Sequence, residues 1–165
     1  MKKILILIVL SIFNFSFVSQ KTKLTPLELY NEILEQELEY PDVVFAQAIL
    51  ESGAFSSKVY KNNNNLFGMR VPYKRETLAK GSKYGYALYN YWQESVADYA
   101  LYQEFYLEKR NKKNIKVTRE QYFAHLDKTY SESSVYVKSL KRVIKENSKI
   151  LYEPPKDRND GVINK

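Results

Sequence analysis

Residues 41–53 read PDVVFAQAILESG, and this stretch decides the fold. Pro41 is typical of the first position of a helix, and Gly53 is placed to end it. The residues between them are apolar on nearly every face of the expected helix, with Gln47 as the exception. A helix without a polar face belongs in the interior of a domain. We therefore predict that this helix is the centre of the fold.

The sequence on either side predicts further helices around this centre. Residues 25–28, Thr-Pro-Leu-Glu, have the form of a capping box, which is typical of a helix start. Polar caps followed by apolar residues at helical spacing predict later helices over residues 95–108, from Thr118 onward, and over residues 133–147. The bulk of the domain is therefore expected to be helical.

Residues 54–65 are polar and end in four consecutive asparagines. This composition predicts a loop after the central helix. We expect Asn62 and Asn63 to be solvated members of that loop.

A different pattern follows the loop. Residues 84–92 alternate in the manner of a β-strand, and residues 70–78 are its predicted partner. Lys80-Gly81-Ser82 is the expected turn between them. The segment from residue 68 to residue 92 is therefore a predicted β-lobe, and the predicted fold class is α+β, mainly α.

The first residues have the pattern of a secretory signal peptide over residues 1–19. A basic start precedes an uncharged apolar stretch, and polar residues follow it. We expect cleavage between Ser19 and Gln20 and export to the periplasm or the extracellular cell-wall space. A catalytic domain over residues 20–152 and a tail over residues 153–165 would remain. An uncleaved membrane anchor is the alternative, although the apolar stretch is short for a bilayer.

The composition narrows the choice of partners. The chain has no cysteine, which excludes disulfides and a lipid-modified cysteine. Its formal net charge is +7, and loss of the leader with its two lysines lowers this to +5. Such a charge suits an anionic cell wall, or it serves solubility alone. Because export is predicted, nucleic acid is not an expected partner. The 15 tyrosines suit carbohydrate as well as an ordinary core.

Glu51 is the candidate for chemistry. It ends the apolar helix, where low polarity and the negative end of the helix dipole both disfavour an ionised carboxylate. A carboxyl that keeps its proton near neutral pH can serve as the acid of a glycosidase, and lysozyme is the established example of this effect. The alternative is a glutamate in the last helical turn with its carboxylate in water.

Residues 45–53, FAQAILESG, and residues 64–70, NNLFGMR, together resemble the glucosaminidase family of bacterial cell-wall hydrolases, glycoside hydrolase family 73. The family patterns are A-Q-A-x-x-E-S-G and N-L-F-G-x-K, so Arg70 stands where lysine is common. The resemblance covers residues 24–151. It implies a lysozyme-like fold, a β-lobe bordering a glycan cleft, peptidoglycan glycan strands as the substrate, and no cofactor.

The resemblance also implies roles for single residues. Glu51 corresponds to the general acid, and Tyr130 to a tyrosine whose hydroxyl faces the reaction centre. A plain core tyrosine is the alternative for Tyr130, and Tyr136 is expected to serve packing. The substrate-binding residues implied are Gln47, Asn65, Phe67 and Gly68.

Hydrolysis of a glycosidic bond commonly uses a second carboxyl group. In the family it is a glutamate on the β-hairpin, and Glu76 is the only acidic residue between Glu51 and Glu94. Glu76 is therefore the candidate, with an ordinary surface glutamate as the alternative. Glu94 is the reserve, and the acetamido group of the substrate is the third candidate.

His125 is the only histidine, and without cysteines or acidic clusters near it the sequence suggests neither a metal site nor a catalytic triad. Three functions remain open. The first is an endo-β-N-acetylglucosaminidase, and the second is a lytic transglycosylase or muramidase on the same fold. The third is a catalytically silent wall-binding or adhesion module. The tetrapeptide Leu66-Phe67-Gly68-Met69 favours the first over the G-L-M-Q motif of transglycosylases.

Overall fold

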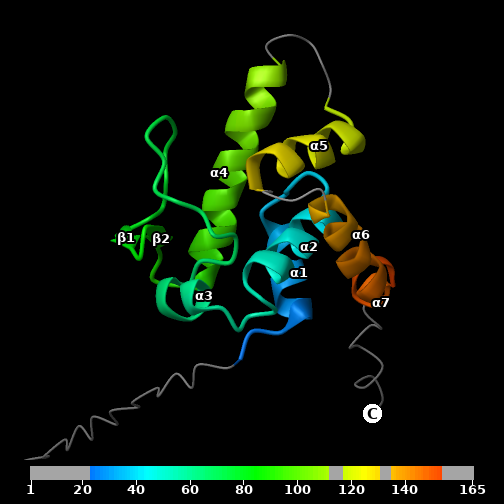
Figure 1. Ribbon diagram of the computed structural model, residues 1–165, viewed down its shortest axis with the longest axis horizontal. Helices are drawn as coiled ribbons and strands as arrows, with labels where there is room; N and C mark the ends of the chain where they lie inside the picture. Colours follow the sequence, from blue (N-terminus) through cyan, green and yellow to red (C-terminus); the bar gives the residue numbers. More distant parts are fainter. Residues whose placement is uncertain (1–22, 112–116, 131–134, 154–165) are drawn as a thin grey trace, which may run out of the picture.

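The computed structural model describes residues 23–111, 117–130 and 135–153. The predicted signal peptide lies outside these residues, as does the predicted tail from residue 154 onward. Within the described ranges, no helix is long and apolar enough to cross a membrane. A helical body carries a small β-lobe on one side (Figure 1), so the predicted α+β, mainly α, fold class is confirmed.

Helix α2 (Pro41–Glu51) lies inside the helical body and packs against α1 (Pro26–Glu35) and α6 (Tyr136–Glu146). Every side chain from Asp42 to Ala48 is buried, which confirms the prediction of a central helix. The apolar side chains among them remove their surface from water, and this burial is the main favourable term in folding. The one carboxylate in this buried run, Asp42, forms an ion pair with Arg119.

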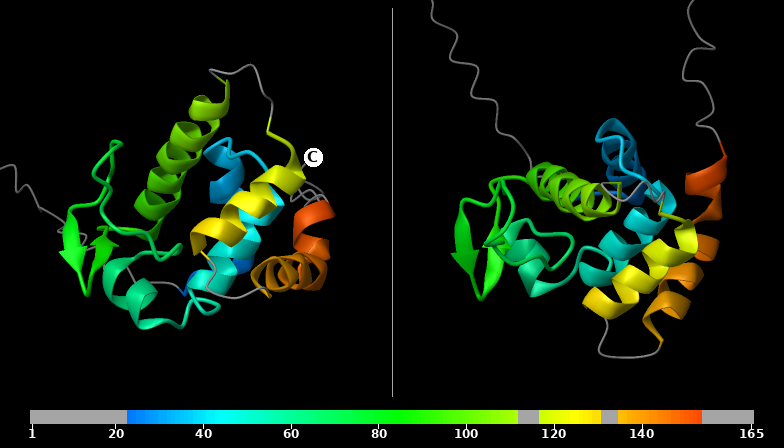
Figure 2. Two further views of the ribbon diagram at one scale, coloured as in Figure 1. Left: turned by 45° about the horizontal axis from the view of Figure 1, so that its top comes forward. Right: turned by 90° about the horizontal axis from the view of Figure 1, so that it is seen from above.

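The other helices surround α2 (Figure 2). The predicted capping box opens α1, because Thr25 Oγ1 accepts from the Glu28 amide and Glu28 Oε2 accepts from the Thr25 amide at 2.8 Å. Helix α5 (Arg119–Tyr130) begins after Thr118, as predicted.

The bounds of one predicted helix were wrong by a few residues, and those of the last helix agree where the chain is described. Helix α4 (Trp92–Asn111) begins before Ser95, and the Ser95 hydroxyl donates to the Trp92 carbonyl at 2.7 Å inside the first turn. Helix α6 matches the described part of the helix predicted over 133–147, of which residues 133 and 134 lie outside the described residues, and a separate α7 (Ser148–Tyr152) follows Asn147.

The β-lobe is smaller than its sequence pattern suggests. Strand β1 (Gly81–Lys83) pairs antiparallel with β2 (Tyr86–Leu88), in the register Gly81↔Leu88. The turn lies at Tyr84 and Gly85, which have positive φ angles of 58° and 78°. A two-residue hairpin turn of type I′ requires such angles at both positions. The predicted turn at Lys80-Gly81-Ser82 and the predicted strand over 70–78 were therefore wrong.

The run of asparagines joins the helical body to the β-lobe. Asn63 ends helix α3 (Lys58–Asn63) and is fully buried, so the predictions of a continuous loop and of a solvated Asn63 were wrong. Its amide donates to the Lys83 carbonyl at 2.8 Å. Asn64, with a φ of 51°, donates to the Tyr89 carbonyl at 3.0 Å.

Asn65 makes the most complete set of these bonds. Its amide nitrogen donates to the carbonyls of Met69 (2.9 Å) and Ala87 (3.0 Å). Its amide oxygen accepts from the backbone amides of Phe67 (3.3 Å) and Met69 (3.1 Å). A single buried side chain therefore fixes the 65–69 turn and attaches it to β2.

We predict that Asn65→Ala destabilises the protein by about 1–3 kcal/mol, because the substitution leaves buried backbone groups without partners. The free energy of unfolding from urea titration measures the effect. Asn62→Ala is the matched control: Asn62 is exposed, and its loss should change stability by less than about 0.5 kcal/mol. Equal effects of the two substitutions would contradict this account of the asparagine run.

Candidate active site

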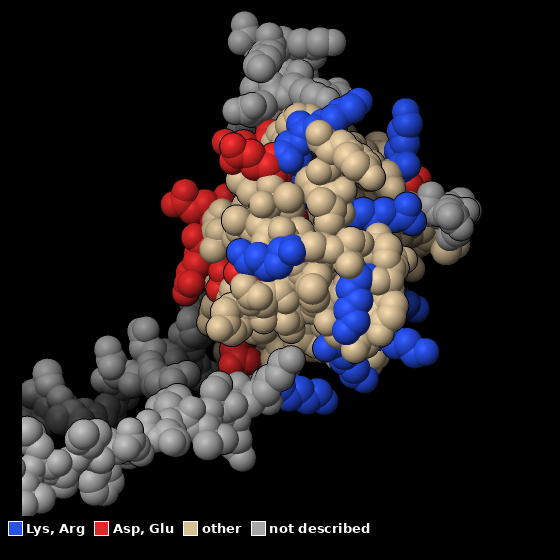
Figure 3. Space-filling model, turned by 90° about the vertical axis from the view of Figure 1, so that its left-hand side faces the viewer, with Lys and Arg blue, Asp and Glu red and all other residues tan. Residues whose placement is uncertain are grey.

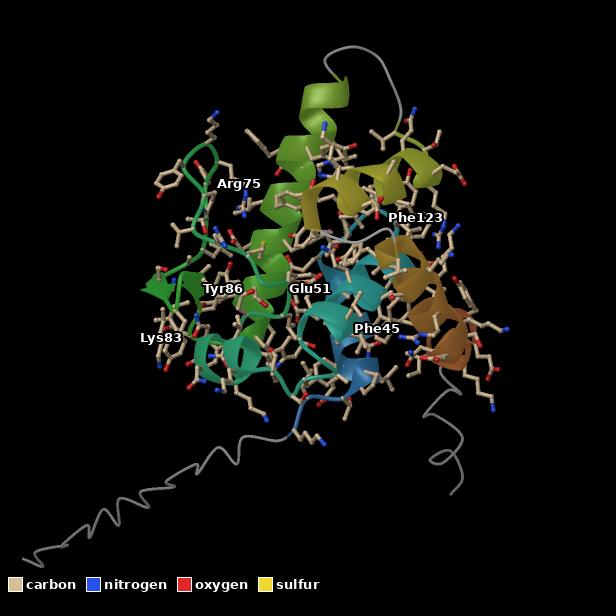
Figure 4. The ribbon with its side chains drawn as sticks, in the orientation of Figure 1. Phe45, Glu51, Arg75, Lys83, Tyr86 and Phe123 are labelled. Atoms are coloured by element: carbon tan, nitrogen blue, oxygen red, sulfur yellow. The ribbon has the colours of Figure 1, made fainter. Side chains whose placement is uncertain are left out.

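Glu51, the last residue of α2, opens onto a cavity of about 640 Å³ between the helical body and the β-lobe. Figure 4 shows Glu51 near the middle of the molecule, with Tyr86 of the β-lobe to one side. The cavity is lined by Glu51, Ser57, Lys58, Val59, Gly68, Met69, Arg70, Pro72, Arg75, Tyr86, Tyr102, Thr129 and Tyr130. Glu51 is the only carboxylate among these described lining residues.

Two opposing effects act on the Glu51 carboxyl. Burial raises its pKa above the usual range, because the apolar surroundings disfavour the charged form. The hydroxyl of Tyr136 donates to Glu51 Oε1 at 2.7 Å and lowers the pKa. Burial is the larger effect, so the net direction is upward, as the sequence predicts. Glu51 therefore has the property that a general acid requires.

Tyr136 was expected to serve packing, and the structure shows that it packs in the core and also bonds to Glu51. Its ring is buried at the start of α6, where α6 packs against α2. Burial and the nearby Glu51 carboxyl raise the pKa of Tyr136, so its hydroxyl stays protonated and can act as a donor. The signal in the sequence is its place on the apolar stripe of α6, because a buried tyrosine hydroxyl needs a partner.

Gln47, predicted to bind substrate, is not among the described residues that line the cavity. Its side chain is fully buried, and its Oε1 accepts from the Tyr99 hydroxyl at 2.6 Å. Its amide group approaches Tyr136 closely enough to lower the pKa of that hydroxyl, although Nε2 makes no hydrogen bond of standard geometry in the described structure. Gln47 lies one helical turn before Glu51 on α2 and borders both Tyr99 and Tyr136.

The 65–68 turn forms part of the cavity wall, but only one of its three predicted binding residues lines the cavity. Gly68 lines the cavity with a φ of 63°, and a Cβ there would lie 3.6 Å from Glu51 Oε2. Asn65 and Phe67 are buried behind it. The Phe67 ring stacks on Tyr99, with 4.2 Å between centroids. These two residues shape the wall and do not face the cavity.

Tyr130 lines the cavity at the end of α5, beside the acid. Its ring is nearly parallel to that of Tyr136, with 6.4 Å between centroids, and it meets Tyr102 edge-on. Burial raises the pKa of Tyr130 well above its usual value, and the Glu51 carboxyl adds to the effect. Tyr130 therefore presents a neutral hydroxyl close to Glu51, and its role in the reaction stays a prediction.

The candidates for a second carboxylate do not line the cavity. Glu76 is exposed, whereas its neighbour Arg75 faces inward. Glu94 accepts from the Asn90 amide at 2.7 Å and lies 3.5 Å from Lys80 Nζ, which gives it a structural role in the first turn of α4. The assignment of Glu76 stays a prediction.

Arg75 is a structural residue of the cavity wall that the sequence did not reveal. Its guanidinium donates to both carboxylate oxygens of Asp98 on α4, at 2.9 and 3.3 Å, and to the Glu76 carbonyl at 2.7 Å. Burial alone would raise the pKa of Asp98, but hydrogen bonds from Arg75, Tyr89 and the Leu78 amide lower it. This buried pair fixes the segment before β1 against α4.

We predict that Tyr136→Phe raises the pKa of Glu51 further, because it removes the hydrogen bond that favours the ionised form. A carbon-13 NMR titration of the side-chain carboxyl measures the change. Tyr152→Phe is the control, since Tyr152 donates to Asp42 and makes no contact with Glu51. A lowered Glu51 pKa in Tyr136→Phe would contradict the assigned hydrogen bond.

Comparisons with known proteins find a similar solved structure, a relative and a matching family. The catalytic domain of the autolysin Auto from Listeria monocytogenes has a similar fold, with a TM-score of 0.50, 24% identity, and coverage of 78% of this chain and 82% of that one. Protein bax of Escherichia coli strain K12 is 41% identical over 71 residues. That match spans 42% of this chain and about a quarter (26%) of the relative. The profile of the glucosaminidase family, described as mannosyl-glycoprotein endo-beta-N-acetylglucosaminidase, matches residues 27–149. The chain therefore belongs to the glucosaminidase family.

Proposed function

We propose that this protein is a peptidoglycan hydrolase that cleaves the β-1,4 bond of N-acetylglucosamine within glycan strands. The observation that carries the proposal is the Glu51 carboxyl, which opens onto the cavity and has a pKa raised by burial. The family name describes an endo-β-N-acetylglucosaminidase, and the similar solved structure belongs to an autolysin. Both support hydrolysis of wall glycan.

Glu51 acts as the general acid in this proposal. Its proton passes to the oxygen of the leaving sugar as the glycosidic bond breaks and positive charge develops on the sugar ring. The Tyr136 hydroxyl, 2.7 Å from Glu51 Oε1, then stabilises the carboxylate that is left behind. Burial therefore keeps the proton on Glu51 before the reaction. The hydrogen bond from Tyr136 lowers the free-energy cost of ionising Glu51 when the proton is transferred.

The aromatic residues of the cavity suit a sugar chain. Three tyrosines line the cavity and come from three separate elements. They are Tyr86 on β2, Tyr102 on α4 and Tyr130 at the end of α5. Tyrosine rings offer apolar faces to sugar rings and hydroxyls for hydrogen bonds. A glycan strand would run through the cavity between the β-lobe and the helices.

Two groups are candidates for the attack on the sugar ring. Glu76 is one residue from Arg75 in the cavity wall and is the proposed second carboxylate. The acetamido oxygen of the substrate is the alternative, as in substrate-assisted glycosidases. That Glu51 is the only carboxylate among the described lining residues favours this alternative.

We predict that Glu51→Gln lowers the rate of glycan hydrolysis by at least about 10²-fold, the usual contribution of general acid catalysis. Glutamine keeps the shape of the side chain and removes the proton, so the circular dichroism spectrum should not change. The control is Glu35→Gln, at an exposed glutamate of α1 outside the cavity. Near-normal activity of Glu51→Gln would overturn the assignment.

Mass spectrometry of the digested wall identifies the bond that is cut. New reducing-end N-acetylglucosamine is the expected product. Anhydro-muramic ends would assign the protein to the lytic transglycosylases instead, and reducing-end muramic acid would assign it to the muramidases. Absence of any glycan cleavage by the wild-type protein would favour a wall-binding module.

A further inference from the structure

The cavity carries more positive than negative charge. Its described lining contains one carboxylate, Glu51, and three cationic side chains, Lys58, Arg70 and Arg75. The charge of Arg75 is balanced by Asp98, and its side chain is almost fully buried, with 7% exposed. Because Glu51 must be protonated to act as an acid, the working site leaves Lys58 and Arg70 without a balancing charge.

Lys58 and Arg70 are placed to meet a ligand. Both side chains are exposed, and neither lies within 4 Å of a carboxylate oxygen in the described part of the chain. Lys58 begins α3, and Arg70 follows Gly68 and Met69 in the cavity wall, so the two charges come from separate elements. We define Lys58 and Arg70 as the cationic rim.

The surface beside the cavity has the same bias. Figure 3 shows the face of the molecule that carries the β-lobe, where basic side chains are spread widely and acidic ones lie mainly along one edge. Glycan made only of N-acetylglucosamine is uncharged, so it would gain nothing from such a rim. Glycan of the cell wall carries carboxylates on its muramyl residues, either in the stem peptide or on the lactyl group once the peptide is removed.

We propose that the cationic rim binds these muramyl carboxylates and makes the enzyme selective for charged wall glycan over neutral N-acetylglucosamine polymers. This inference rests on the proposed function and names the substrate class of the same site. Charges at the rim of a site act mainly on encounter and on salt dependence. The preference should therefore appear in kcat/KM and weaken as the salt concentration rises.

The test compares three substrates of equal glycan length: soluble glycan with stem peptides, the same glycan after amidase treatment, and N-acetylglucosamine oligomers. The wild-type protein should favour the charged substrates. In Lys58→Gln/Arg70→Gln the ratio of kcat/KM for charged over neutral substrate should fall by roughly three- to tenfold, as expected for exposed ion pairs. Loss of the preference after amidase treatment assigns the bound group to the stem peptide, and its retention assigns it to the lactyl carboxylate.

The control is Lys61→Gln/Lys83→Gln, which removes the same net charge at exposed positions outside the cavity lining. An equal fall in this variant would show that overall charge is responsible and would overturn the proposal. Equal rates of the wild-type protein on all three substrates would also overturn it, while leaving the hydrolase function intact.

Binding measurements test the cationic rim separately from the proposed hydrolase function. Calorimetric Kd values for the same three ligands, measured in the Glu51→Gln protein, should show the same ranking without any turnover. If the wild-type protein cleaves no glycan, the proposed function fails, and these Kd values still test the rim. Equal affinity for charged and neutral glycan would then overturn the inference.

Discussion

The complete burial of helix α2 is the constraint on which the rest of the structure depends. An apolar run with no polar face can be stable only when other helices enclose it, and α1 and α6 do so. The same enclosure determines the chemistry at its end. Glu51 lies where the buried helix reaches a cavity, so the surroundings that stabilise the fold also disfavour ionisation of its carboxyl.

A half-buried acid is useful only if it can also give up its proton. Tyr136 helps Glu51 to do so, because its hydroxyl donates a hydrogen bond that favours the ionised carboxylate. The packing of α6 on α2 places this hydroxyl. Gln47 lies one turn earlier on α2 and borders the same tyrosine. The acid and its hydrogen-bond donor therefore have fixed positions within the core. The opposite wall is held by Asn65 and by the Arg75–Asp98 pair, which attach the β-lobe to the helices.

The sequence predicted the features that depend on local pattern. The central helix, the capping box at Thr25 and the helix after Thr118 all follow from residue type and spacing, and the structure confirms them. The raised pKa of Glu51 was also predictable, because burial of α2 could be read from its composition.

Features that depend on tertiary contacts could not be read in this way. Asn63 was expected in a solvated loop and Gln47 at the substrate, yet both are buried, where a backbone carbonyl and Tyr99 are their hydrogen-bond partners. The hairpin turn at Tyr84 and Gly85 was hidden by an alternating pattern that continues beyond the short strands. The partner of Tyr136 is 85 positions away in the chain, and only the packing of two helices brings it into contact.

The most direct test of the central claim is the pH dependence of kcat/KM for glycan hydrolysis by the wild-type protein. That profile reports the ionisation of the free enzyme. If burial keeps the proton on Glu51, the alkaline limb of the profile should lie well above the pKa of about 4.3 of an ordinary glutamate. An alkaline limb at the ordinary glutamate value would contradict the account, because the acid would then be ionised like any exposed side chain.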